Sequence, residues 1–200
     1  MAEPTARERT AYHEAGHAVM SWICGWPVMA VSIENEDGEL GHTVRQVPDG
    51  FAVSSYASRG VWTDSEHFWR LMQTAMITLA GIQAEVLQFG GESEEYADWA
   101  ESDMAEARAA IRQMCSQEDE IEETACLNYL AIRTRNQLGN RINSWPYVDA
   151  LAKRLLKEPV LDVDHVEQVF EAVVEAQIEL PPPGLAIPFY DGSSASSSES

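Results

Sequence analysis

Two histidines and a glutamate near the N-terminus have a spacing that can bind a metal ion. Residues 13–17 read His-Glu-Ala-Gly-His, so His13 and His17 are four residues apart. In an α-helix such residues lie on one face, one turn above the other, and two imidazoles so placed can bind one zinc ion. Glu14 would lie beside the metal, as a general base for a water molecule that attacks a carbonyl. The motif predicts a catalytic site with one Zn²⁺ per chain; the alternative is a surface helix with these residues by chance.

The residues around the motif are expected to form a helix. The segment 6–24 contains no proline and no glycine except Gly16, and Gly-Trp-Pro at 25–27 is a stop signal. Apolar residues recur along it at helical spacing, namely Ala11, Ala15, Ala18, Val19, Trp22 and Ile23. A glycine inside a helix costs about 1 kcal/mol relative to alanine. Gly16 therefore indicates that another element packs closely against this helix.

After this helix, the spacing of apolar residues predicts a β-hairpin. Its strands are expected at 28–33 and 40–44, joined by a turn at 36–38. A hairpin beside the metal helix can offer a free edge to which an extended peptide adds as a further strand. We expect the second strand to bind substrate in this way, through Leu40, Gly41, His42 and Thr43. The alternative is an ordinary solvent-facing hairpin.

The rest of the chain is expected to be helical, which makes the fold mainly α with one small hairpin. A capping box at 63–66 begins a long helix that ends at Gly90-Gly91. Further helices are expected at 104–114, from about 120 to 139, at 144–157, and from Asp162 or Asp164 to 177. The acidic stretch 92–103 is expected to be an exposed loop. We predict one domain at 1–178 and a Pro/Ser-rich disordered tail at 179–200.

Asp103 is a candidate for a third metal ligand. It precedes the helix expected at 104, and its spacing to Glu106 is also that of a capping box. An N-cap role and a ligand role are therefore both open for Asp103.

The composition argues against several classes of partner. The 200-residue chain has a net charge of −20 and a pI near 4.4, which disfavours nucleic acid and anionic membranes. No apolar run approaches the roughly 20 residues of a membrane span, and no signal peptide is expected. The three cysteines, Cys24, Cys115 and Cys126, form no C-x-x-C pair and are expected to be thiols in a reducing compartment. We expect a soluble, cytoplasmic protein.

The chain resembles the protease domain of FtsH-type zinc metallopeptidases, the proteolytic half of membrane-bound AAA+ proteases. Residues 8–18, ERTAYHEAGHA, are similar to the zinc helix of that family almost residue for residue. Weaker similarities follow in the family's order. They lie at 31–33 and 40–43 for its active-site hairpin, 79–85 and 89–90 for its second helix, 102–104 for its aspartate ligand, and 156–166 for its C-terminal helices. The resemblance covers about residues 7–172.

The resemblance implies a helical, zincin-like protease domain in which His13, His17 and Asp103 bind zinc and Glu14 is the base. Glu85 then holds the tautomer of a histidine ligand, and it remains the alternative third ligand. The chain departs from the family at Ile82, where an arginine is usual, and in the acidic loop before Asp103. Protease domains of the family form six-membered rings, so a homo-oligomer is possible.

A further departure concerns energy supply. The sequence contains no G-x-x-x-x-G-K-[ST] stretch, and therefore no P-loop ATPase motif. We expect an ATP-independent zinc metalloendopeptidase that hydrolyses peptide bonds in unfolded or disordered polypeptides. One alternative is a zinc-binding regulatory or interaction protein with the same fold and little turnover. The other is the peptidase subunit of a two-component system with a separate ATPase.

Overall fold

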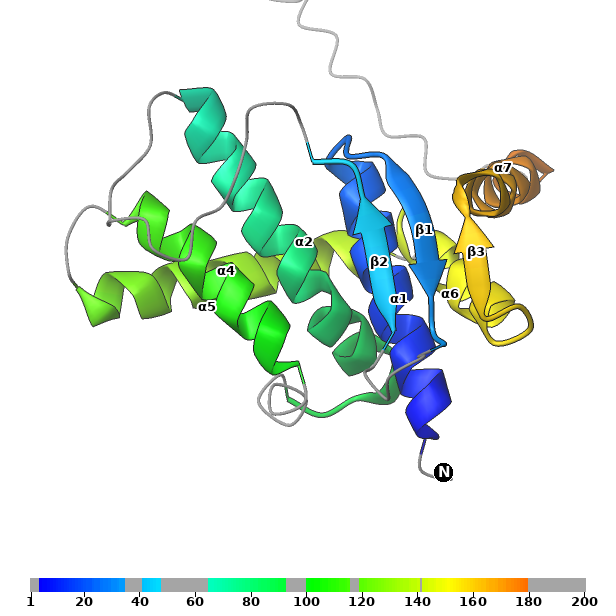
Figure 1. Cartoon of the computed structure of the whole chain (residues 1–200), viewed down its shortest axis with the longest axis horizontal. Coiled ribbons are helices and arrows are strands. Elements are labelled where there is room, and N and C mark those ends of the chain that lie inside the picture. The colour runs from blue at the N-terminus through cyan, green and yellow to red at the C-terminus, as the bar shows by residue number, and fades with distance from the viewer. Residues whose placement is uncertain are drawn as a thin grey trace, which may run out of the picture.

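The computed structural model describes residues 4–34, 41–47, 65–92, 100–115, 119–140 and 142–179. They form a mainly helical fold with one small sheet, as the sequence predicts (Figure 1). The helices are α1 (Ala6–Ile23), α2 (Ser65–Phe89), α4 (Glu101–Met114), α5 (Glu120–Leu138), α6 (Trp145–Leu155) and α7 (Val163–Glu179). The strands are β1 (Val28–Ser32), β2 (His42–Arg45) and β3 (Val160–Asp162). No helix in the described ranges is long and apolar enough to cross a membrane.

Helix α1 is the central element of the fold. The sheet packs on it, with α2 on one side and α6 on the other (Figure 1). A capping box begins the helix: the Thr5 hydroxyl accepts from the Glu8 N–H, and the Glu8 carboxylate accepts from the Thr5 N–H. Residues 10–21 are all buried, because neighbours surround the middle of the helix. The histidine motif therefore lies inside the fold and not on a surface helix.

Helices α1 and α2 approach closely at two glycines. A Cβ at Gly16 would lie 2.5 Å from the carbonyl oxygen of Ala80 and 2.7 Å from the Cβ of Ala84. A Cβ at Gly81 would lie 2.5 Å from Nε2 of His13. The close packing predicted from Gly16 is confirmed. Because both helices carry a glycine at the crossing, α2 lies directly against the histidine face of α1.

The sheet has three antiparallel strands in the order β2-β1-β3. Val31 in β1 lies opposite Thr43 in β2 on one side and Leu161 in β3 on the other. The predicted hairpin is confirmed as β1 and β2, whereas its turn at 36–38 and Leu40 lie outside the described residues. The sequence did not predict β3, because three residues carry too little alternation to be recognised. It becomes a strand through pairing with β1 and burial of Leu161.

Several helix boundaries differ from the expected ones. Helix α4 begins at Glu101, so residues 101–103 are helical rather than part of the expected loop 92–103. Asp162 rather than Asp164 caps α7, since its carboxylate accepts from the N–H of His165. Helix α7 extends to Glu179, one residue past the expected end of the domain. Residues 63–64, 93–99 and the expected tail from 180 lie outside the described part of the chain.

Candidate metal centre

His13 and His17 of α1 meet Asp103, which lies in the first turn of α4. Nε2 of His13 is 2.8 Å and Nε2 of His17 is 3.2 Å from Oδ2 of Asp103. One ligand atom from each residue lies within 4.8 Å of the other two. Ligand atoms of a tetrahedral zinc site are about 3.3 Å apart, given bonds of about 2.0–2.1 Å. The three side chains therefore fit one zinc ion after a small outward shift of their ligand atoms.

The other nitrogen of each ring is held by a hydrogen bond. Nδ1 of His17 lies 2.8 Å from the carbonyl oxygen of Ile77, which only accepts, so Nδ1 carries the hydrogen. Nδ1 of His13 lies 2.7 Å from Oε1 of Glu85, and Nε of Arg9 donates to Oε2 of the same carboxylate at 2.9 Å. In a neutral imidazole, a hydrogen on Nδ1 leaves the lone pair on Nε2. Both rings therefore present their metal-binding nitrogen toward Asp103.

The structure separates the two candidate carboxylates by position. Asp103 faces both Nε2 atoms, whereas Glu85 lies on the opposite side of the His13 ring and is fully buried. Asp103 is not the N-cap that its spacing suggested. The N-cap position is Ala100, which has no side-chain hydrogen bond to the helix, so Asp103 is the third residue of α4. Asp103 is therefore the better-positioned candidate for a third ligand, while Glu85 contacts the far nitrogen of His13.

The electrostatics of the cluster favour a cation at its centre. Burial would lower the pKa of His13, but hydrogen bonds to Asp103 and Glu85 and the charge of Glu14 raise it to about 10. Burial would raise the pKa of Asp103, but His17 and His13 hold it well below its usual range. Without a metal, the carboxylates therefore retain a proton on His13. A divalent cation would satisfy the same negative charge in place of that proton.

This competition predicts how metal affinity depends on pH. A zinc ion bound here would have to displace the proton from Nε2 of His13, and the pKa of about 10 favours the protonated ring at neutral pH. We expect the apparent affinity for zinc to rise about tenfold per pH unit between about pH 7 and pH 9. Competition with a chromophoric chelator, corrected for the chelator's own protonation, measures this slope. A pH-independent affinity would contradict a shared site for the proton and the metal.

Glu14 lies beside the ligands without belonging to the cluster of ligand atoms. Its side chain is buried, and Oε2 accepts a hydrogen bond of 2.8 Å from the hydroxyl of Thr43 in β2. The Thr43 hydroxyl is also 3.1 Å from the Glu14 carbonyl oxygen. A Cβ at Gly41 would lie 2.9 Å from Cγ of Glu14, so β2 packs tightly over this residue. An ion pair between Arg45 and Glu106, at 2.9 Å, ties β2 to α4.

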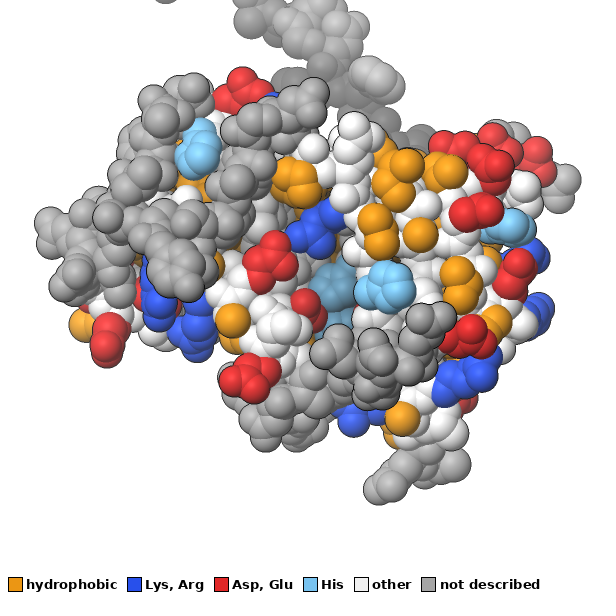
Figure 2. Space-filling model, in the orientation of Figure 1, with side chains coloured by type: hydrophobic (Ala, Val, Ile, Leu, Met, Phe, Trp, Pro, Cys, Tyr) orange, Lys and Arg blue, Asp and Glu red, His pale blue; other side chains and the backbone are white. Residues whose placement is uncertain are grey.

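The predicted substrate strand divides into inward and outward positions. Gly41 and Thr43 contact Glu14, while His42 is exposed. β2 is an edge of the described sheet, and through Thr43 this edge strand contacts Glu14. Leu40 is outside the described residues. In the space-filling view, histidine side chains lie near the centre of this face, with acidic and basic side chains beside them (Figure 2).

Sequence reasoning missed three groups that position the ligands. Arg9 precedes His13 by one helical turn, so its spacing could have linked it to the site. Gly81 carries the same signal as Gly16, a glycine inside a helix where a neighbour approaches closely. The carbonyl of Ile77 has no signature in the sequence, because every residue has one. It became part of the site only through the crossing of α1 and α2.

The chemistry of the centre follows from its donors. Two imidazoles and one carboxylate are a ligand set that catalytic zinc sites use, with a fourth position left for water or substrate. A buried carboxylate beside such a set can move a proton to and from the reacting atoms. The arrangement therefore suits metal-assisted hydrolysis of a carbonyl compound. Neither a protein-family model nor a curated protein matches this chain.

Proposed function

We propose that this protein is an ATP-independent zinc metalloendopeptidase that hydrolyses peptide bonds in unfolded or disordered polypeptides. The observation that carries the proposal is the position of Glu14, which is buried next to His13 in α1 and accepts a hydrogen bond from Thr43. A structural zinc site completes its coordination with a fourth protein ligand and needs no base. Among the described residues, the cluster of His13, His17 and Asp103 offers three. The resemblance to the FtsH-type protease domain points to the same reaction.

In this reaction, the residues around the metal would each have a distinct role. Zinc, when bound, would polarise the substrate carbonyl and lower the pKa of a water molecule. Glu14 would accept the proton of the attacking water and then give it to the leaving amine. Thr43 holds the Glu14 carboxylate, and Arg9 acts through Glu85 to hold His13. These contacts keep the base and the ligands in place before substrate arrives.

The strand edge next to Glu14 supports the proposed substrate class. Addition of a peptide to an edge strand uses main-chain hydrogen bonds, which any extended polypeptide can form. A folded substrate would first have to unfold, at a cost of roughly 5–15 kcal/mol, and the sequence contains no P-loop to drive that step. We therefore expect the substrates to be unfolded or disordered polypeptides, cleaved with little preference for their sequence.

Incubation with casein tests the proposal. The purified zinc-loaded protein should cleave casein without ATP, lose that activity with a chelator, and regain it on addition of zinc. A tightly folded reporter should survive, while the same reporter with an unstructured tail should be cut in the tail. No cleavage by protein that retains its zinc would favour the interaction protein instead. Cleavage that requires a cell extract and ATP would favour a separate ATPase partner.

Thr43 offers a test of how the base is held. We expect Thr43→Val to lower kcat roughly tenfold with zinc content and KM unchanged, since a hydrogen bond to a charged group contributes roughly 1.5 kcal/mol. Thr43→Ser keeps the hydroxyl and should retain most of the activity. Steady-state cleavage of an unstructured fluorogenic peptide measures both constants. Equal losses in the valine and serine variants would assign Thr43 to packing alone. Thr43→Pro would not test strand addition by itself. Because Thr43 contacts Glu14, this change would disturb both the proposed base and the strand edge.

A further inference from the structure

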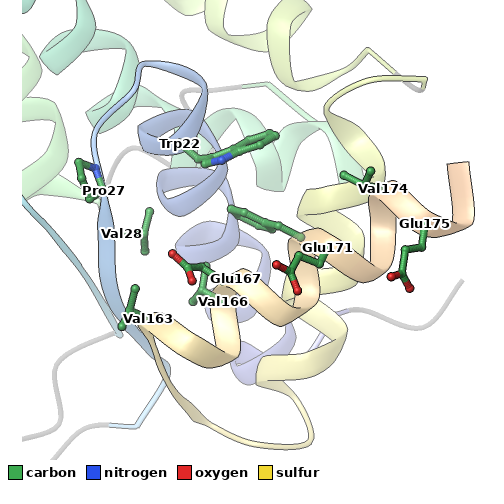
Figure 3. Close-up of a pocket in the computed structure, with 10 residues that line it drawn as sticks. Trp22, Pro27, Val28, Val163, Val166, Glu167, Glu171, Val174 and Glu175 are labelled. Atoms are coloured by element: carbon green, nitrogen blue, oxygen red, sulfur yellow. The ribbon is translucent and has the colours of Figure 1, made fainter. Parts of the chain in front are cut away.

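A groove in the protein surface lies on the side of α1 opposite the candidate metal ligands. Trp22 follows His13 by nine residues, which places it half a turn around the helix. There it lines a groove of about 760 Å³ between the end of α1, the start of β1 and helix α7 (Figure 3). The proposed hydrolysis uses none of these residues.

The wall of the groove contains a fixed but accessible aromatic ring. The Trp22 indole packs on Tyr147 and on Phe170, each with a ring-centroid distance of 5.0 Å. Tyr147 and Phe170 are buried and pack edge to face on each other at 5.4 Å. Trp22 is nevertheless 46% exposed. An aromatic ring that is held in place on one face and open on the other can anchor a ligand with little loss of entropy.

A row of negative charge borders the same groove. Glu167, Glu171 and Glu175 follow one another at four-residue spacing along α7, and all three are exposed (Figure 3). Like charges at this spacing repel each other and destabilise a helix. Within the described part of the chain, no lysine or arginine forms an ion pair with them. Among the described residues, no basic side chain therefore neutralises the row, and a basic ligand would reduce its repulsion.

We propose that this groove binds a basic amphipathic helix of another protein. Its apolar side chains would cover the valines of the groove, which are Val28, Val163, Val166 and Val174. A lysine or arginine would lie over the Trp22 indole in a cation–π contact. Further basic residues at four-residue spacing would pair with the glutamates of α7, in the helix-in-groove mode.

The segment that follows α7 does not match such a helix. Residues 158–200 contain no lysine or arginine, so the region after α7 cannot neutralise the glutamate row. A second copy carries a net charge of −20, and long-range repulsion would oppose its approach to an acidic groove. Charge complementarity therefore points to a basic partner.

Fluorescence anisotropy with a labelled 16-residue peptide tests the proposal. The peptide contains leucine and alanine on one face and lysines at four-residue spacing on the other, and the control peptide has glutamate for lysine. The protein is the full chain with Glu14→Gln, so that the peptide is not hydrolysed. We expect micromolar binding of the lysine peptide at low salt, weakening as salt rises, and no binding of the control.

Variants locate the binding surface. The triple change Glu167→Gln, Glu171→Gln and Glu175→Gln should weaken binding at least tenfold, as should Trp22→Ala, with the fold checked by circular dichroism. Trp69→Ala is the matched control, because Trp69 is 48% exposed on α2 and does not line the groove, and it should leave affinity unchanged. Equal binding of the glutamate peptide, no binding at 0.1 mM, or insensitivity to the triple change would overturn the proposal. Self-association that the triple change abolishes would instead identify a second copy as the occupant. Every readout here is binding, so the outcome is independent of peptidase activity.

Discussion

Replacement of Glu14 by glutamine should leave about one zinc ion per chain and reduce turnover roughly 10²–10⁴-fold, the usual loss when a general base is removed. Zinc should stay because the cluster of ligand atoms comprises His13, His17 and Asp103 without Glu14. The fold should also persist. Glutamine has nearly the same volume as glutamate, and its amide oxygen can still accept the hydrogen bond of Thr43.

Two measurements on the same preparation check this result: zinc content by atomic absorption, and the initial rate of casein cleavage. Glu101→Gln is a suitable control, since Glu101 is exposed in the first turn of α4 and contacts none of the ligands in the described structure. It should match the wild-type protein in both measurements. Loss of zinc together with activity in Glu14→Gln would show that Glu14 is itself a ligand.

Replacement of Asp103 by asparagine should remove both zinc and activity. The amide oxygen carries no charge to balance the metal, and asparagine is a poor ligand for zinc. We expect zinc affinity to fall by more than about 100-fold, because changes to groups that only orient a ligand already cost 10–100-fold. Helix α4 should remain folded, since it begins at Glu101 and does not depend on Asp103 as a cap.

Glu85→Gln provides the comparison that ranks the two carboxylates. Glu85 contacts the far nitrogen of His13, so its amide variant should lose about 10–100-fold in zinc affinity and keep measurable activity at saturating zinc. Titration with a competing chelator gives both affinities. A larger loss for Glu85→Gln than for Asp103→Asn would exchange the roles of the two carboxylates.

The local parts of this protein could be predicted from its sequence. The bounds of α1, the hairpin of β1 and β2, and the mainly helical fold depend on spacing of apolar residues, on capping residues and on turn signals, which act within a few positions of the chain. The pairing of His13 with His17 is local for the same reason, since a helix brings residues four apart to one face. Gly16 even indicated a close neighbour, although the sequence did not say which element it was.

Only the tertiary structure decided how the centre is completed. Asp103 is 90 positions from His13, and Glu85 is 72 positions away, so residue spacing could not rank them as ligands and only the family resemblance favoured Asp103. The crossing of α1 and α2 set the ranking, because it placed Glu85 against Nδ1 of His13, while α4 brought Asp103 to both Nε2 atoms. The same holds for the hydrogen bond from Thr43 to Glu14 and for strand β3. Each depends on contacts between distant segments, whose geometry follows from packing of the whole chain rather than from the residues next to them.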